Sequence, residues 1–306
     1  MNLELGIRNL ELQMNLVIIA NPAAGCGRAY KSVQSYVRRW PHPEWNVRIM
    51  TTRSRDHAGL LAQKLLDDPP DLLAVCGGDG TLNEIASRVP HPPFPVALIP
   101  AGTANVLARE LGIPLNPVRA VQVALERTVR KVDLGKLGTG TRRFLFVAGI
   151  GFDAHVVASV RPKLKNTLGM AAYAAAVIGC LRHYSFPKFQ VVADGRTFTA
   201  TSCLACNATN YGGGLLFCPD ADMTDGQLDI LVIEGERRLR LARFLLNAWR
   251  GKAETGDWIH RLRARTLQVE GSAGVLVQAD GELAGNLPLE ISLSRSSFPL
   301  VIPSKI

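Results

Sequence analysis

The sequence predicts a chain of two parts, in which a parallel α/β half over residues 14–130 precedes a mainly antiparallel β half over residues 131–306. Up to Arg130, short β-rich runs alternate with stretches of helical periodicity, as in the βαβ units of a doubly wound sheet. After Lys131, β-rich runs follow one another across short turns, as in hairpins. With 306 residues, 47% of them hydrophobic, the chain is long enough for two cores.

The alternation divides the first half into strands and helices. The expected strands are NLVIIA (15–20), WNVRIM (45–50), DLLAVC (71–76) and FPVALIP (94–100). The expected helices are GRAYKSVQSYVRRW (27–40), RDHAGLLAQKLLDD (55–68), TLNEIASRV (81–89), NVLARELG (105–112) and NPVRAVQVALE (116–126). This order is typical of a parallel sheet whose connections are helices.

The second half reads as strands with two helical insertions, around 166–184 and around 236–252. The expected strands are KVDLGKL (131–137), RRFLFVAGIGF (142–152), FQVVAD (189–194), TFTATSCLACNA (197–208), DGQLDILVIE (225–234), RTLQVEG (265–271) and GVLVQADGE (274–282). The dipeptide between FQVVAD and TFTATSCLACNA marks a hairpin turn at residues 193–196. Residues 1–13 carry no clear pattern, which leaves Met14 as a candidate natural start.

Charge and cysteine content indicate the class of binding partner and the cellular compartment. A net charge of +9 and a pI near 9.5 favour a polyanionic partner, which leaves nucleic acid, an anionic membrane surface and a phosphorylated ligand open. The six scattered cysteines and the lack of a leader-like segment indicate a reduced, cytoplasmic protein. Cys203 and Cys206 point to opposite faces of an expected strand, so they predict neither a metal site nor a redox pair. The longest uncharged apolar stretch, 168–181, is too short to span a bilayer.

The stretch VCGGDGTLNEIA (75–86) joins a strand end, a glycine-rich turn and a helix start. Backbone N–H groups and the helix dipole converge on an anion in such a turn, which predicts a phosphate-binding loop. The loop matches neither common fingerprint, because Asn83 replaces a glycine of the dinucleotide motif and Tyr30 spoils the P-loop motif in GCGRAYKS. Asp79 suits such a loop if it binds Mg²⁺ or acts on a proton; the alternative is a helix cap.

Two further glycine-bearing turns, NPAAGCGR (21–28) and IPAGTANVLARELG (99–112), follow the first and fourth expected strands. All three turns leave the carboxyl-end edge of one parallel sheet, where ligands bind in open α/β folds. Uncharged hydroxyl and amide groups accompany them, namely those of Asn21, Thr81, Thr103 and Asn105. The sequence therefore predicts a nucleotide site at this edge.

Five spaced motifs resemble the diacylglycerol kinase catalytic-domain family, which includes bacterial soluble diacylglycerol kinases, related bacterial lipid kinases and sphingosine kinases. They are NPAAG, GGDGTLNE, IPAGTAN, the stretch 207–230 (NATNYGGGLLFCPDADMTDGQLDI) and QADGE (278–282). The resemblance runs from about residue 15 to the C-terminus, whereas GGDG alone is shared with NAD kinases and phosphofructokinases. It implies transfer of the γ-phosphoryl group of ATP to a lipid hydroxyl, with Mg²⁺, between a domain of the phosphofructokinase and NAD kinase type and a β-sandwich domain.

The resemblance also implies site residues. The nucleotide would be lined by Asn21, Pro22, Ala23, Ala24, Gly25, Thr52, Gly77, Gly78, Asp79, Gly80, Thr81, Leu82, Asn83, Glu84 and Thr103. Asp280 would lie near the metal and phosphates, and Glu282 would accept the proton. A structural Mg²⁺ in the second domain would fall at Asp222, Asp225 and Gln227.

Two details of these motifs leave alternatives open. In a strand, Asp280 and Glu282 would share a face, as metal and proton chemistry requires; without the resemblance, a hairpin turn with both acids solvated is the better interpretation. The family motif after the fourth strand ends in asparagine-aspartate, where this chain has Asn105 and Val106. Either the remaining acids suffice, or metal affinity and activity are weakened.

A lipid acceptor requires access to a membrane. Residues 236–265 carry nine Lys or Arg against three acids, and Leu241, Phe244, Leu245, Ala248 and Trp249 fall on one helical face. This pattern fits a peripheral helix on an anionic membrane and, equally, a helix packed on the second domain. No nucleic-acid-binding module is present in the sequence, and the oligomeric state stays open, a homodimer included. The alternatives to a lipid kinase are a soluble-metabolite kinase of the NAD kinase type and a catalytically weak lipid-binding regulator.

Overall fold

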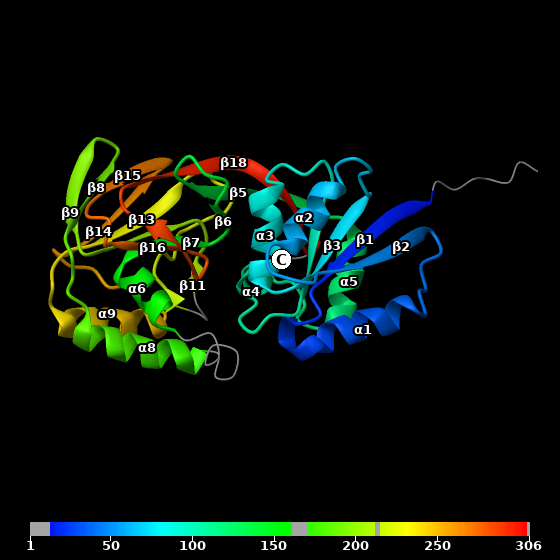
Figure 1. The fold of residues 1–306 in the computed structure, drawn as a ribbon, viewed down its shortest axis with the longest axis horizontal. Coiled ribbons are helices and arrows are strands. Elements are labelled where there is room, and N and C mark those ends of the chain that lie inside the picture. The colour runs from blue at the N-terminus through cyan, green and yellow to red at the C-terminus, as the bar shows by residue number, and fades with distance from the viewer. Residues whose placement is uncertain (1–12, 161–169, 212–214, 305–306) are drawn as a thin grey trace, which may run out of the picture.

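A computed structural model describes residues 13–160, 170–211 and 215–304, and Figure 1 shows its ribbon. Residues 1–12, the beginning of the insertion expected around 166–184, and the glycines at 212–214 lie outside the described residues. The elements of the first half are β1 (Met14–Ala20), η1 (Ala24–Gly27), α1 (Arg28–Val37), β2 (Trp45–Thr51), α2 (His57–Lys64), β3 (Leu72–Gly77), α3 (Asp79–Arg88), β4 (Val96–Pro100), α4 (Val106–Glu110) and α5 (Pro117–Glu126).

The second half is described from its first strand nearly to the end of the chain. Its elements are β5 (Val129–Leu137), β6 (Arg143–Phe144), β7 (Val147–Gly151), α6 (Phe152–Ser159), α8 (Met170–His183), β8 (Phe189–Ala193), β9 (Arg196–Ala200), β10 (Ser202–Cys206), β11 (Asn210–Tyr211), β12 (Leu215–Leu216), β13 (Leu228–Ile233), α9 (Arg238–Trp249), β14 (Ile259–Ala264), β15 (Thr266–Glu270), β16 (Leu276–Ala279), β17 (Glu282–Asn286) and β18 (Leu289–Val301).

The first half is the expected doubly wound unit. Its strands pair in parallel in the order β2-β1-β3-β4. Every residue of β3 and β4 is buried, as in strands covered on both faces, and β2 at the edge is partly exposed. Helices α1 and α5 pack together on one side of the sheet, and α2 and α3 pack together on the other (Figure 1). The predicted fold class is confirmed for this half.

The second half is a sandwich of two antiparallel layers. One layer is a six-stranded sheet in the order β14-β13-β10-β7-β16-β17. The other consists of β5, β6, β8, β9, β15 and β18, which belong to the ten-stranded sheet. Apolar side chains from both layers, among them Ile150, Val191 and Ile291, form one buried core. The antiparallel strands predicted from the hairpin-like runs and the β-sandwich implied by the resemblance are both confirmed.

Strand β18 is shared by the two halves. It pairs antiparallel with β5 and β15, and near its end Leu300 pairs in parallel with Val96 of β4. The ten-stranded sheet is therefore continuous across the molecule, and β18 lies along its upper side in Figure 1. Phe298 and Leu300 of β18 are fully buried, so this strand is part of the core and not a loose tail.

Three helices cover the outer side of the six-stranded sheet. Helix α6 packs on β7 and β16, and α8 and α9 lie side by side outside it, at the bottom of Figure 1. On α9, Leu241, Phe244 and Ala248 are buried, and Phe244 stacks on Phe217 with ring centroids 5.6 Å apart. The face that helical periodicity offered to a membrane is thus mainly the packing face, with Trp249 as the exception at 68% exposure. Among the described residues, no helix combines the length and apolar character needed to cross a bilayer.

Candidate active site

The three glycine-bearing turns meet at the carboxyl ends of β1, β3 and β4. A Cβ atom placed on Gly25, whose φ is +54°, would lie 2.4 Å from the carbonyl oxygen of Ala101. A Cβ atom on Gly78 would lie 3.1 Å from Cα of Gly102. The loops approach so closely that any side chain at these glycines would push them apart. The glycines therefore build a compact floor made of backbone.

Polar side chains tie the three turns together. The side-chain amide of Asn21 donates to the hydroxyl of Thr81 over 3.2 Å, which links the first turn to the second. Asn105 closes the third turn, because its Oδ1 accepts from the N–H of Gly102 at 2.8 Å and its Nδ2 donates to the carbonyl of Gly102 at 2.9 Å. Thr103 lies exposed beside this turn. Thr52 is buried, and its N–H extends the pairing of β2 with β1.

Not every residue of the GGDGTLNE stretch faces a ligand. Helix α3 begins at Asp79, and Leu82 points into the hydrophobic core with no exposed surface. Asn83 is buried as well, and Oε2 of Glu84 accepts from the N–H of Ala58 at the start of α2. Gly80 is exposed, and a Cβ atom there would meet open space. The first turn of α3 is therefore the part of the stretch that can receive an anion.

Asp79 links two helices. Its Oδ2 accepts from the N–H of Val106 at 3.0 Å, and its Oδ1 accepts from the N–H of Leu107 at 3.1 Å. It therefore caps α4, a helix other than the one it begins. Burial raises the pKa of the Asp79 carboxyl, and the backbone N–H groups of Val106 and Leu107 oppose that rise. The N–H of Asp79 itself is a third donor to this carboxylate. Three donors leave part of its capacity of about four lone pairs free, so a hydrated cation fits here alongside the capping role.

The QADGE motif forms a hairpin turn between β16 and β17, and the expectation that its two acids share a strand face is wrong. Ala279 pairs with Glu282, while Asp280 and Gly281 have φ values of +48° and +80°. Two consecutive residues with positive φ make the tight turn that suits the twist of a hairpin. The alternative, a hairpin turn with both acids solvated, is correct for the turn and for Glu282, whose side chain is 42% exposed, but wrong for Asp280, whose carboxylate accepts three backbone N–H groups.

The carboxylate of Asp280 holds the segment that enters β7. It accepts three backbone N–H groups, from Leu145 at 2.7 Å, Phe146 at 2.9 Å and Val147 at 3.0 Å. Burial raises the pKa of Asp280 to about 7, the three N–H groups oppose the rise, and the negative charge of Asp79 adds to it. Asp79 and Asp280, far apart in sequence, therefore lie close enough to sense each other's charge.

Glu282 joins the two halves of the protein through a pair of arginines. Its Oε2 lies 2.6 Å from Nη2 of Arg55, which follows β2, and 3.2 Å from Nη2 of Arg142, which precedes β6. Arg55 and Glu282 are 227 residues apart in the sequence. Neither arginine could be predicted as a partner of Glu282, since no local pattern connects a residue after the second strand with the turn near the C-terminus.

A second set of contacts that the sequence did not reveal lies behind the turn. Oε1 of Gln278 accepts from the N–H of Gly281 at 2.7 Å, and its Nε2 donates to Oδ2 of Asp153 at 2.7 Å. The hydroxyl of Tyr211 donates to Asp153 as well, at 3.0 Å. Burial raises the pKa of Asp153 to about 6, and these two donors oppose the rise. This cluster of Asp153, Tyr211 and Gln278 holds the turn in place through the hydrogen bond from Gly281 to Gln278.

The structural Mg²⁺ site at Asp222, Asp225 and Gln227 is not brought together as an ion site in the described residues, where no group of three acidic, histidine or cysteine side chains is placed to hold a metal. Asp222 accepts from Thr224, and Oδ1 of Asp225 accepts from the N–H of Gln227. Oδ2 of Asp225 lies 2.6 Å from Nη2 of Arg263, whose Nε lies 3.2 Å from Asp229. These contacts favour a loop bridged by Arg263 over the structural ion implied by the resemblance.

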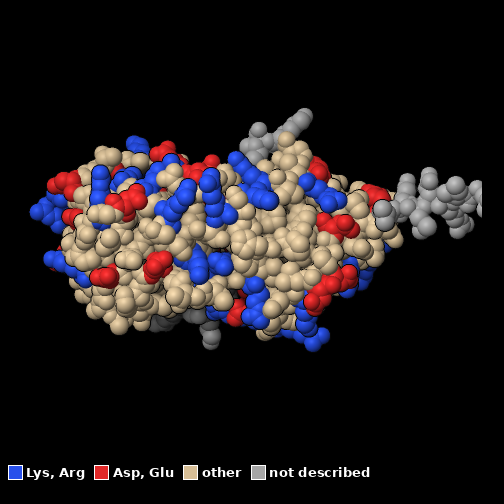
Figure 2. Space-filling model, turned by 90° about the horizontal axis from the view of Figure 1, so that it is seen from above, with Lys and Arg blue, Asp and Glu red and all other residues tan. Residues whose placement is uncertain are grey.

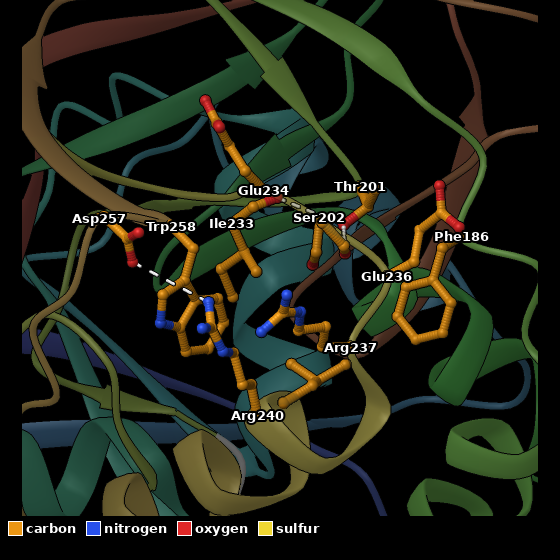
Figure 3. Close-up of a pocket in the computed structure, with 12 residues that line it drawn as sticks. Phe186, Thr201, Ser202, Ile233, Glu234, Glu236, Arg237, Arg240, Asp257 and Trp258 are labelled. Atoms are coloured by element: carbon orange, nitrogen blue, oxygen red, sulfur yellow. Dashed lines mark hydrogen bonds and ion pairs between the residues drawn. The ribbon is translucent and has the colours of Figure 1, made fainter.

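A cavity of about 300 Å³ lies away from the three turns, at the start of α9 (Figure 3). The side chains of Arg237 and Arg240 point into it, and the acids Glu234, Glu236 and Asp257 line it too. Arg240 lies 3.9 Å from Asp257, and the hydroxyl of Thr201 donates to the carbonyl of Gly235. Glu234 and Glu236 contact His260 and Lys188, which do not line the cavity, so no group of acids converges in it as a phosphoryl-transfer site would require.

Both halves of the chain match known family models. The diacylglycerol kinase catalytic domain model matches residues 15–137, and the YegS C-terminal NAD kinase beta sandwich-like domain model matches residues 147–302. The chain is 32% identical over 293 residues to a diacylglycerol kinase of Mycobacterium tuberculosis, covering 93% of this chain and 94% of that protein. It is 32% identical over 235 residues to a protein of Chromohalobacter salexigens named "probable lipid kinase YegS-like", covering 74% of each.

Solved structures agree with the fold. The crystal structure of a diacylglycerol kinase from Bacillus anthracis matches with a TM-score of 0.70 at 22% identity, covering 95% of this chain and 97% of that one. At this identity the match shows the fold alone. The two family models and the Mycobacterium tuberculosis relative show the family as well as the fold, because their matches cover both halves of the chain. The chain belongs to the diacylglycerol kinase catalytic-domain family.

Proposed function

We propose that the protein is a lipid kinase that transfers the γ-phosphoryl group of ATP to the hydroxyl of a diacylglycerol-, sphingoid- or phosphatidylglycerol-like acceptor. The observation that carries the proposal is that the QADGE turn reaches the first half of the protein: Oε2 of Glu282 lies 2.6 Å from Nη2 of Arg55. In addition, the negative charge of Asp79 in the GGDG turn raises the pKa of Asp280. Acids at one point fit a reaction that needs both cation binding and a proton acceptor.

The backbone floor of the three turns is the proposed triphosphate site. Phosphate oxygens approach glycine backbone closely, and the first turn of α3 supplies N–H groups and the positive end of the helix dipole. Mg²⁺, when bound, would offset charge on the phosphates. Asp79 is the residue proposed to hold it, because its oxygens keep free lone pairs in a partly buried position. Asp280 would act mainly by positioning, since its carboxylate already accepts three N–H groups.

Glu282 is the proposed proton acceptor. A lipid alcohol is a weak nucleophile at neutral pH, so a carboxylate must take its proton as the bond to phosphorus forms. Both arginine contacts of Glu282 are on Oε2. We propose Oε1 as the atom that accepts the proton, while Arg55 and Arg142 fix the direction of the side chain.

Phosphoryl transfer from γ-labelled ATP tests the proposal directly. The purified protein is incubated with labelled ATP, Mg²⁺ and mixed micelles that contain one lipid alcohol at a time, with NAD as the soluble alternative. We expect label in at least one lipid and none in NAD. A preparation of Glu282→Gln, purified in parallel, controls for contaminating kinases.

The three candidate functions give different results. Label in NAD would replace the proposal by a kinase of the NAD kinase type. Label in neither class, across an extract of total lipids, would favour a lipid-binding regulator, for which Val106 at the usual aspartate position is the motivating residue. Mass spectrometry of the labelled extract would identify the acceptor.

A further inference from the structure

We propose that the solvent-facing side of α8 and α9, which we call the α8–α9 face, docks onto an anionic lipid bilayer. This inference rests on the proposed function, because an enzyme that acts on a lipid must bind to the membrane that contains it.

The two helices expose the same kind of stripe. On α9, residues at spacings of four, three and four are exposed, and they alternate between apolar and basic: Leu239, Arg243, Leu246 and Arg250. On α8, the same spacings give Ala171, Ala175, Ile178 and Arg182, all exposed. Such spacings place the four side chains of each set on one side of a helix. Each stripe is thus apolar over much of its length and ends in an arginine.

The apolar exposure of this face is large. Leu239 is 87% exposed, Trp249 68%, Ile178 53% and Leu246 44%. Lone exposed apolar residues are ordinary on a protein surface, but several on two adjacent helices form a patch, and such patches mark interaction sites. Tryptophan and leucine among arginines are the composition of helices that lie in the headgroup region of a bilayer.

The positive charge of the α8–α9 face favours binding to an anionic bilayer. Neither α8 nor α9 contains an aspartate or glutamate. The nearby Glu254 is buried and bonded to Arg243, and Lys252 adds a further positive charge just beyond α9. By contrast, the upper face of the molecule, drawn in Figure 2, shows basic and acidic side chains interspersed over both halves. Two exposed acids flank α9, and both pair with basic residues, Glu236 with Lys188 and Asp257 with Arg240. The helices themselves present only apolar and basic side chains, which complement anionic headgroups.

The position of α8 connects the face with the proposed reaction. Tyr173 lies in the first turn of α8, and its hydroxyl would be 3.7 Å from a Cβ atom built on Gly281 of the acidic turn. The beginning of α8 therefore lies beside that turn, and the rest of the helix runs along the exposed side of the second half (Figure 1). Tyr173 lies on the side of α8 opposite the exposed stripe, so a bilayer seated on the α8–α9 face would be separated from the turn that carries Glu282 by the width of this helix.

Vesicle binding with tryptophan as the reporter tests the inference. Trp249 is the most exposed tryptophan reported for the described residues, whereas Trp45 is buried. We expect vesicles of phosphatidylglycerol to shift the emission of Trp249 to the blue and to bind the protein at least about tenfold more tightly than vesicles of phosphatidylcholine, an advantage that salt weakens. Trp249→Phe should abolish the spectral shift.

The double variant Leu239→Ser/Leu246→Ser should weaken sedimentation with phosphatidylglycerol vesicles by about tenfold or more, because each leucine loses apolar burial in the interface. Leu66→Ser is the matched control, since Leu66 is 42% exposed on the first half, against 44% for Leu246. Unchanged melting temperatures would show that the variants stay folded. Vesicle binding of the double variant equal to that of the wild type would overturn the inference.

Two further outcomes separate this inference from the proposed function. Transfer to lipid in detergent micelles without binding to anionic vesicles would refute the docking face and keep the kinase. Binding to anionic vesicles through Trp249, without phosphoryl transfer to any lipid, would support the docking face and refute the kinase. If the double variant instead turned a dimer into a monomer, as measured by analytical ultracentrifugation without lipid, the face would be a contact between two copies and the inference would be wrong.

Discussion

At the scale of single residues, Glu282 is the side chain on which the proposed chemistry depends most. Replacing it with glutamine keeps the size of the side chain and removes its ability to accept a proton. We expect kcat for lipid phosphorylation to fall about 10²–10⁴-fold, the usual contribution of a general base. KM for ATP should change little, because Glu282 is not part of the backbone floor that would hold the phosphates.

The neighbouring Leu283→Ala is the matched control for Glu282→Gln, since Leu283 lies next along β17 and is 48% exposed. It should retain activity within a small factor. A Glu282→Gln variant with a near-normal kcat would assign the proton to another group, and Arg55 and Arg142 would then have to be explained as a purely structural contact between the halves.

Asp153 gives a prediction about pH. Burial raises the pKa of Asp153 from 3.8 to about 6, so its carboxyl stays neutral to a higher pH in the folded protein than in the unfolded chain. Its contribution to stability is fully present below about pH 4 and is lost as the pH rises through 6. Relative to Asp153→Asn, whose side chain does not titrate, the wild type should lose up to about 3 kcal/mol of unfolding free energy between pH 4 and 7.

Urea denaturation of both proteins at several pH values measures this difference. Groups that titrate in both proteins cancel in the comparison, so the slope of the difference reports Asp153. Parallel pH profiles for wild type and Asp153→Asn would show that the carboxyl titrates at the same pH in both the folded and unfolded states, and that the cluster with Tyr211 and Gln278 holds an ordinary ionised acid.

The residues that the sequence could identify are those inside short motifs. Asp79, Asp280 and Glu282 stand in glycine-rich stretches whose composition signals a special backbone, and the structure brings them together. Their partners could not be predicted from the sequence, because Arg55, Arg142 and Asp153 make contacts between segments that are far apart in the chain. The hairpin at Asp280 was foreseen only as an alternative, because DG between two β-rich runs is a turn signal that the chemical argument set aside.

At the scale of elements, the loop of residues 222–229 is stabilised either by Arg263 or by a bound Mg²⁺, and thermal unfolding distinguishes the two. We expect EDTA and added Mg²⁺ to leave the melting temperature unchanged. Arg263→Ala should lower it by about 2 °C or more, because Asp225 and Asp229 lose their shared guanidinium, a partly exposed contact worth about 1 kcal/mol. Differential scanning calorimetry measures both effects.

Arg196→Ala on β9 is the control, since Arg196 is an exposed arginine of the same half. It should leave the melting temperature within about 1 °C, as expected of an isolated surface substitution. A wild-type melting temperature that rises with Mg²⁺ and falls with EDTA would instead restore the ion at Asp222, Asp225 and Gln227.

Elements with strong periodicity were predicted well, and the others were missed for identifiable reasons. The strands and helices of the first half match the expected ones, because each is bounded by turn residues. Helix α6 was not expected, since it starts directly after β7 at Gly151 with no side chain bonded as a cap, and only its first residue, Phe152, stood at the end of the expected strand 142–152. Strand β18 was not expected at all: it carries a register shift between Ser294 and Phe298, and partners on both edges hold it in place.

At the scale of the whole molecule, β18 should make the two halves unfold as one unit. Chains of this size with two cores often unfold in steps. Here the last strand completes the second half and also pairs with β4, so the first half cannot lose its sheet without disturbing the other. The approach of Asp79 to Asp280 depends on the same continuous sheet, which is why cooperativity bears on function.

The four tryptophans divide evenly between the halves, with Trp40 and Trp45 in the first and Trp249 and Trp258 in the second. Two double Trp→Phe variants, each keeping one pair, report on each half during urea denaturation. We expect their midpoints to coincide. Phe298→Ala, which empties a fully buried position of β18, should cost about 3–5 kcal/mol and move both midpoints together. If only the second-half reporters moved, the shared strand would not couple the halves, and the acidic turn would meet the glycine turns through a hinge rather than through a continuous sheet.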